Sequence, residues 1–104
     1  MIETTTDFIP GKKITKILGV VKGSTIRSRG IGGHFIARIE SAFGGQITAY
    51  MKALDEARDE AYQKMMQDAE KKGADAVINI RFATSQVMPQ AAEILVYGTA
   101  VKVG

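Results

Sequence analysis

Cysteine and tryptophan are absent from this 104-residue chain, which has a single histidine, His34. Without cysteine there is no disulfide, no thiolate nucleophile and no sulfur-ligated zinc or iron–sulfur site. No meaningful Ser-His-Asp order surrounds the single histidine. The adjacent carboxylates at 55–56 and 59–60 point about 100° apart if they lie on a helix. The sequence therefore predicts a protein that is not an enzyme.

Long uncharged segments are also missing, and none approaches the roughly 18 residues that a membrane span needs. The first residues have neither the basic nor the apolar region of a secretory signal. We therefore expect a cytoplasmic protein without a membrane partner. A chain of this length makes one domain, 1–104, with a small core of its own. Because contacts between copies would add to the buried surface, we expect a homo-oligomer.

The formal net charge of +3 is unevenly distributed. Residues 8–39 contain seven bases and no acid, whereas residues 40–72 contain seven acids and five bases. A basic stretch attracts phosphates and acidic lipids, but nucleic-acid binders usually add aromatic or motif signatures. The only aromatic residues in this stretch are Phe8 and Phe35. We therefore expect no nucleic-acid partner, and bases that are solvated or face the acidic helix of the same or a neighbouring chain.

Two strands are expected first. β-Branched residues at 4–8 favour a short strand, which a proline-glycine turn then ends. Residues 14–26 have a strand signature, and Gly19 and Gly23 within it indicate a bulge or a close backbone approach.

Two helices follow. Apolar residues between 31 and 43 have helical spacing, and Gly44 and Gly45 are expected to end this shorter helix. The clearest element is 46–72, where residues spaced by three and four predict one buried face. This stripe consists of Ile47, Tyr50, Met51, Leu54, Ala57, Ala61, Met65 and Ala69.

Residues 76–83 are expected to form a third strand, 85–92 a connecting loop and 94–103 a fourth strand. The last two strands are close in sequence and should pair as an antiparallel hairpin. The order of elements predicts an α+β fold, in which an antiparallel β-sheet packs on one long helix and one shorter helix.

Five spaced segments also stand in a characteristic order. They are Gly19-Val20-Val21-Lys22-Gly23, Gly44-Gly45 with Tyr50, Ala57-Arg58 with Ala61, Gly73-Ala74-Asp75-Ala76-Val77 and Gly98-Thr99-Ala100-Val101. Together they resemble the YbjQ family, also called UPF0145 or DUF74, over nearly the whole chain. The resemblance implies a single YbjQ-like domain with a dodecin-like sheet and long helix, assembled as a ring-shaped pentamer. Members are described as heavy-metal-binding, so it also implies a metal ion.

This chain departs from the family at the implied metal ligands. Relatives often have acids in the first helix and along the third strand, where His34, Ser41, Arg81 and Ala83 stand here. Carboxylates are natural ligands for hard and borderline cations. With one histidine and no cysteine, a tetrahedral zinc site is possible only on a symmetry axis. We therefore expect no cofactor, and His34 is the one weak metal-ligand candidate.

A candidate anion site lies at the start of the shorter helix. Arg27, Arg29, Gly32 and Gly33 would hold a phosphate or carboxylate with guanidinium groups and backbone amides at a positive helix end. The alternative is an ordinary glycine-rich turn, since no P-loop lysine follows.

Further residues are expected to be structural or to lie at subunit interfaces. Arg58 adjoins the apolar stripe, and a buried arginine needs a fixed partner. The full set is Gly44, Gly45, Tyr50, Arg58, Gly98 and Thr99. The sequence thus predicts an oligomeric module that binds a small ligand or ion. The alternatives are a purely structural or interaction ring and a weak anion or nucleic-acid binder that uses the basic half.

Overall fold

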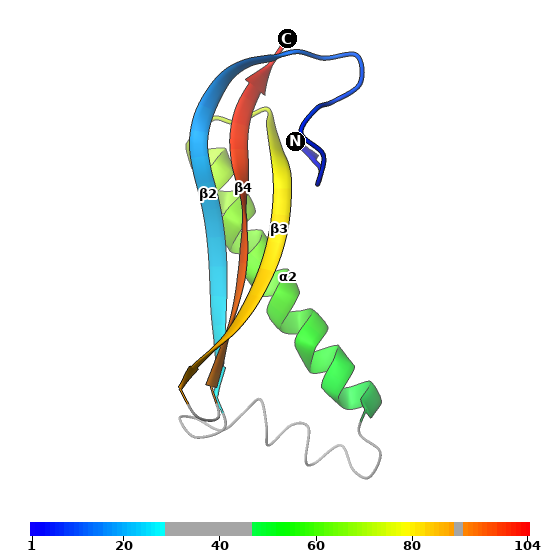
Figure 1. The fold of residues 1–104 in the computed structure, drawn as a ribbon, viewed down its shortest axis with the longest axis vertical. Helices are drawn as coiled ribbons and strands as arrows, with labels where there is room; N and C mark the ends of the chain where they lie inside the picture. The colour runs from blue at the N-terminus through cyan, green and yellow to red at the C-terminus, as the bar shows by residue number, and fades with distance from the viewer. Residues whose placement is uncertain (29–46, 89–90) are drawn as a thin grey trace.

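The computed structural model describes residues 1–28, 47–88 and 91–104. They contain the strands β1 (Ile2–Glu3), β2 (Ile14–Ser28), β3 (Ala76–Met88) and β4 (Ala91–Val103) and the helix α2 (Ile47–Lys71). The strands form a sheet in the order β1-β3-β4-β2, and α2 lies along one face of it (Figure 1). The predicted α+β architecture with a long helix is confirmed. The shorter helix expected at 31–43 lies outside the described residues.

The sheet is mixed rather than wholly antiparallel. β4 pairs antiparallel with both β2 and β3, so the predicted hairpin of the last two strands is confirmed. The N-terminal segment runs beside β3 in the same direction, with Ile2 opposite Ala76. The prediction of an antiparallel sheet is wrong at this edge, because the chain crosses from β1 to β2 at the opposite edge instead of turning back as a hairpin.

The first strand also differs from the one predicted at 4–8. β1 ends earlier, but the Thr4 amide still donates to the Val77 carbonyl at 3.0 Å. Regular pairing then stops because Asn79 adopts a left-handed backbone (φ 54°) where the β3–β4 register shifts. The Asn79 amide turns instead to the Thr6 carbonyl, at 3.0 Å.

The loop predicted at 85–92 is mostly strand. β3 continues to Met88 and β4 begins at Ala91, so Pro89 falls in the connection outside the described residues. The polar residues before it lie opposite residues of β4. Pairing with a neighbouring strand outweighed their weak strand propensity.

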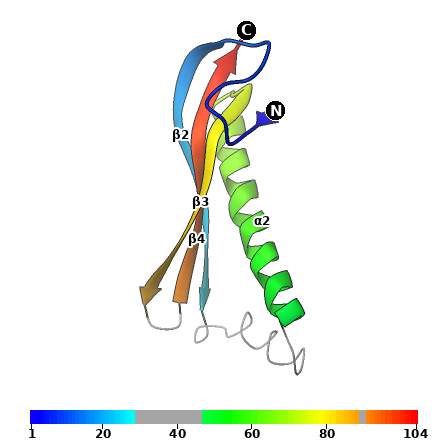
Figure 2. The ribbon, with the colours of Figure 1, turned by 45° about the vertical axis from the view of Figure 1, so that its right-hand side comes forward.

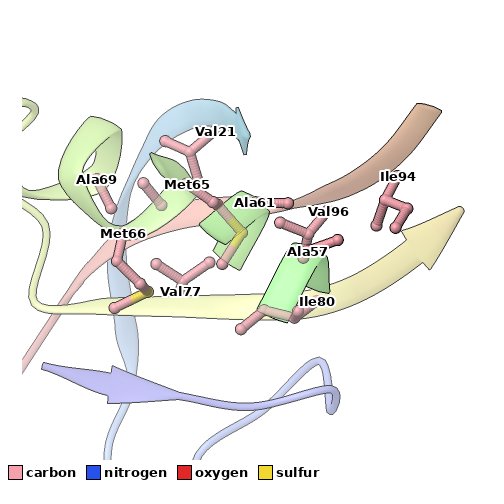
Figure 3. Close-up of a cluster of buried hydrophobic side chains, with 11 residues drawn as sticks. Val21, Ala57, Ala61, Met65, Met66, Ala69, Val77, Ile80, Ile94 and Val96 are labelled. Atoms are coloured by element: carbon pink, nitrogen blue, oxygen red, sulfur yellow. The ribbon is translucent and has the colours of Figure 1, made fainter. Parts of the chain in front are cut away.

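The core lies between α2 and strands β2, β3 and β4 (Figure 3). The C-terminal half of the predicted stripe is confirmed, since Ala57, Ala61, Met65 and Ala69 are fully buried. The side chains of Ile47 and Tyr50 lie outside the described residues. Met51 is 58% exposed, because the helix and the strands diverge toward the start of α2 (Figures 1 and 2). The sheet side chains that pack against the helix are Val21, Val77, Ile80, Ile94, Val96 and Ala100.

At Gly23 the backbone of β2 lies directly against α2. A Cβ atom placed there would be 2.1 Å from the Ala61 carbonyl oxygen and 2.5 Å from the Met65 amide nitrogen, closer than any side chain can come. The predicted close backbone approach is therefore confirmed at Gly23. The predicted bulge is found at Gly19, where the β2–β4 register shifts and φ is 125°.

The N-terminal segment covers one end of the other face of the sheet. Ala76, Ile78 and Val101 point to that face and are buried there, packed against Ile2 and Ile9. In the part of the chain that the structure describes, no helix is long and apolar enough to cross a membrane.

Replacing Gly23 with alanine is expected to lower the free energy of unfolding by at least about 1–3 kcal/mol, because the added methyl group must push β2 and α2 apart. Ser24→Ala is the matched control. Its side chain points to the opposite face of the strand, and the change should cost less than about 0.5 kcal/mol. Urea unfolding followed by circular dichroism measures both values. Wild-type stability in Gly23→Ala would contradict the close contact.

Candidate functional site

Arg27, the first residue of the candidate anion site, is already paired with an acid. Its Nη2 atom lies 2.6 Å from Glu60 Oε2 between β2 and α2, with the two side chains 27% and 47% exposed. This hydrogen bond is the main reason that the pKa of the Glu60 carboxyl lies below its ordinary value. An anion at Arg27 would have to compete with Glu60. Arg29, Gly32 and Gly33, the other members of the candidate site, lie outside the described residues.

Lys64 extends this pairing along the helix. Its Nζ atom donates to the Ser24 carbonyl at 3.0 Å and lies 3.8 Å from Glu60 Oε1. Ser24, Arg27, Glu60 and Lys64 thus form a polar seam between β2 and α2. Its charged groups bind one another and a backbone carbonyl, so the seam aligns the helix on the strand.

Arg58 is exposed, contrary to the expectation that it has a buried partner. It is 51% exposed and lies 3.3 Å from the carboxylate of Asp55, which is 70% exposed. Arg58 follows the buried Ala57, and successive helical side chains point about 100° apart. Within one chain this is a surface ion pair of small energetic value. Of the other residues predicted to be structural or at interfaces, Gly44 and Gly45 lie outside the described residues. The backbone of Tyr50 lies in the first turn of α2, but its side chain is outside the described part.

Gly98 and Thr99 belong to the interior of the sheet. A Cβ atom at Gly98 would lie 2.8 Å from Val77 Cγ1 and 3.0 Å from the Ile78 carbonyl oxygen. Glycine therefore fits where β4 passes the irregular stretch of β3. Thr99 is half-buried, opposite Val20 on β2 and Ile78 on β3. Both residues serve sheet packing within the chain, and an interface role for them stays a prediction.

The described residues do not assemble a heavy-metal site within one chain. Zinc and copper bind most tightly to thiolates and imidazoles, and the chain has only His34 to offer, itself outside the described residues. Among the residues that are described, no group of three or more histidine, cysteine, aspartate or glutamate side chains could hold a metal ion. Arg81 donates to the Thr5 and Ile80 carbonyls at 2.9 Å each. It therefore fastens the N-terminal segment to β3.

Tyr62, which no sequence pattern singled out, links α2 to the N-terminal segment. Its hydroxyl donates to the Glu3 carboxylate, and its ring stacks on Phe82 with the centroids 6.2 Å apart. Burial, and then the Glu3 carboxylate, raises the pKa of Tyr62. Glu3 is 59 residues away in sequence, so no local pattern could have indicated this contact.

Glu60→Gln is expected to reduce the loss of stability in acid. Because the pKa of Glu60 is lowered in the folded protein, its carboxylate stabilises the fold above the ordinary value of 4.5, and this contribution is lost as the pH falls through the lowered value. The pair is partly exposed, so the contribution is under about 1 kcal/mol. Urea unfolding at neutral and acidic pH measures it. The difference in unfolding free energy between neutral and acidic pH should be smaller in Glu60→Gln than in the wild type, and the control Asp59→Asn should keep the wild-type difference. A wild-type difference in both variants would disprove the role of Glu60.

Comparison with known sequences relates the whole chain to one family. A family model described as "Putative heavy-metal-binding" matches residues 1–104. A UPF0145 protein of Methanosarcina acetivorans is 55% identical over 103 residues, which cover 99% of this chain and 97% of that protein. A UPF0145 protein of Vibrio parahaemolyticus is 49% identical over 102 residues, with 98% and 97% covered.

The fold has a counterpart among solved structures. A crystal structure from Pediococcus pentosaceus, of a protein of unknown function in the DUF74 family, matches with a TM-score of 0.66 and 20% sequence identity. The match covers 100% of this chain and 98% of that one. At this identity the likeness concerns the fold alone, but the full-length family match and the half-identical relatives go further. The chain belongs to the YbjQ family, UPF0145.

Proposed function

We propose that this protein is a cytoplasmic homo-oligomer, a dodecin-like ring of five chains, that holds a small ligand or ion where subunits meet and has no catalytic activity. The apolar surface of β2 is the observation that supports it. Ile17, Val20 and Ile26 are 69%, 68% and 59% exposed. Val20 points away from α2, because its neighbour Val21 is buried beneath the helix.

Strand β2 is suited to contact a second copy. Among the described residues it is the last strand in the sheet order, so one side of its backbone has no neighbour there. Tyr97 on the adjacent β4 is also exposed and continues the apolar surface. Apolar surface on an edge strand favours association with another chain. A contact that joins two different surfaces of the chain repeats from copy to copy, and it forms a ring when the rotation between copies closes. The family resemblance implies five members.

The alternative is a purely structural ring without a ligand. The pairing of Arg27 with Glu60 favours it, since the guanidinium group expected to bind an anion already contacts a carboxylate. In either case the assembly is the first property to establish.

Native mass spectrometry of the purified protein tests the assembly. We expect a species of five 11.2-kDa chains. Val20→Glu should shift it to single chains with an unchanged circular dichroism spectrum, because burying an unpaired charge in an apolar contact is costly. Gln67→Glu, at an exposed position of α2, should keep the wild-type mass. Single chains in the wild-type protein would refute the ring.

Titration calorimetry tests the ligand. We expect no submicromolar binding of Zn²⁺ or Cu²⁺ at one ion per chain, because tight sites for these ions use thiolates and imidazoles. Such binding would overturn the expectation. One ion per ring, lost in His34→Ala, would instead indicate histidines gathered on a symmetry axis. Titration with phosphate then tests the anion site, and binding that Arg27→Gln abolishes would assign Arg27 to that site.

A further inference from the structure

Lysines from three distant segments meet at one end of the molecule. At this end α2 ends, β2 begins and β4 ends (Figure 1). Lys16 lies opposite Lys102 across the β2–β4 pair, and two backbone hydrogen bonds of 2.9 and 3.1 Å join Lys13 to Gly104. This group of exposed residues is named the lysine end. It consists of Lys12, Lys13, Lys16, Lys71, Lys72 and Lys102.

Most of the net side-chain charge of the protein is concentrated there. The acids at or beside the lysine end are Asp7, Asp68, Glu70 and Asp75, with Lys72 3.5 Å from Asp68 and Lys102 3.5 Å from Asp75. The rest of the sequence contains eight bases and seven acids, so the six lysines and four acids account for +2 of the formal charge of +3. The lysine end is therefore the place where a polyanion would be attracted.

Exposed apolar side chains accompany these lysines. Phe8 is 59% and Ile14 37% exposed, and they stand on either side of a tight turn that leads into Lys12 and Lys13. Peripheral proteins meet a bilayer with this combination. The apolar side chains enter the headgroup boundary while the lysines remain with the lipid phosphates.

From the charge and the apolar side chains together, we propose that the lysine end docks reversibly on a membrane surface containing anionic lipid. A nucleic acid would use the same charges but leave Phe8 without a partner, whereas a bilayer takes up both the charges and the apolar side chain. The expectation of no membrane partner came from the sequence, in which the three lysine segments are far apart. Only the folded chain brings them together at one surface. The membrane proposal does not depend on the proposed ring.

Co-sedimentation with lipid vesicles tests the lysines. The wild-type protein should bind vesicles of mixed phosphatidylcholine and phosphatidylglycerol, less at high salt, and should not bind phosphatidylcholine alone. Each lysine near an anionic surface strengthens binding about fivefold, so Lys13→Gln/Lys16→Gln should bind about twenty-five-fold more weakly. The control Lys22→Gln/Lys52→Gln removes the same charge elsewhere and should bind like the wild type. Equal binding of the two double variants, or no binding of the wild type, would overturn the proposal.

Phe8→Ser separates a lipid surface from other polyanions. It should weaken binding to the mixed vesicles about tenfold while leaving any binding to a labelled DNA duplex unchanged. Vesicle binding that is insensitive to Phe8→Ser, with duplex binding that depends on Lys13 and Lys16, would assign the lysines to nucleic acid and refute the lipid proposal. Circular dichroism of each variant confirms that the fold is intact.

Discussion

The backbone contact between Gly23 and α2 determines how the rest of the molecule is arranged. Because β2 has no side chain there, the Ala61 carbonyl lies directly on the strand. The helix is thereby held close enough for the Thr25 hydroxyl to donate to the Ala57 carbonyl at 3.3 Å. The same contact brings Glu60 of α2 within hydrogen-bond distance of Arg27. The contact at Gly23, rather than the polar seam, sets the distance between α2 and β2. The long side chains of the seam could adapt to other distances, whereas two backbones in direct contact could not.

β2 has apolar residues on both of its faces, and the face away from the helix also holds Lys22 and Ser24. Toward the helix it presents small or buried residues, whereas away from the helix it presents exposed aliphatic ones such as Val20. Strands that are apolar on both faces are typical of sheets covered on both sides. The composition of β2 therefore agrees with a strand whose second face is covered by another chain in the proposed ring.

The parts of the fold that could be predicted are those set by local patterns. The spacing at 46–72 located α2 to within a residue at each end, and the glycines of β2 indicated the bulge and the close approach. The parallel pairing of β1 depends on the path of the chain between elements, and the exposure of Met51 depends on the angle between helix and sheet. Neither can be predicted from the spacing of nearby residues. The same holds for the candidate site. Arg27 was identifiable, and its pairing with Glu60 agrees with the expectation that bases of the N-terminal half face the acidic helix. Which acid it meets could not be predicted, because Glu60 is 33 residues away in sequence.

The order of the strands constrains how the protein forms on the ribosome. β4 is the last strand in sequence, yet it lies between β3 and β2. β2 therefore emerges during synthesis long before its hydrogen-bonding partner exists, and the sheet can close only when the final strand has been made. Until then, among the described elements, only α2 can cover β2. The nascent chain thus contains an unpaired apolar strand until β4 has been made, and unpaired strand edges are prone to aggregate.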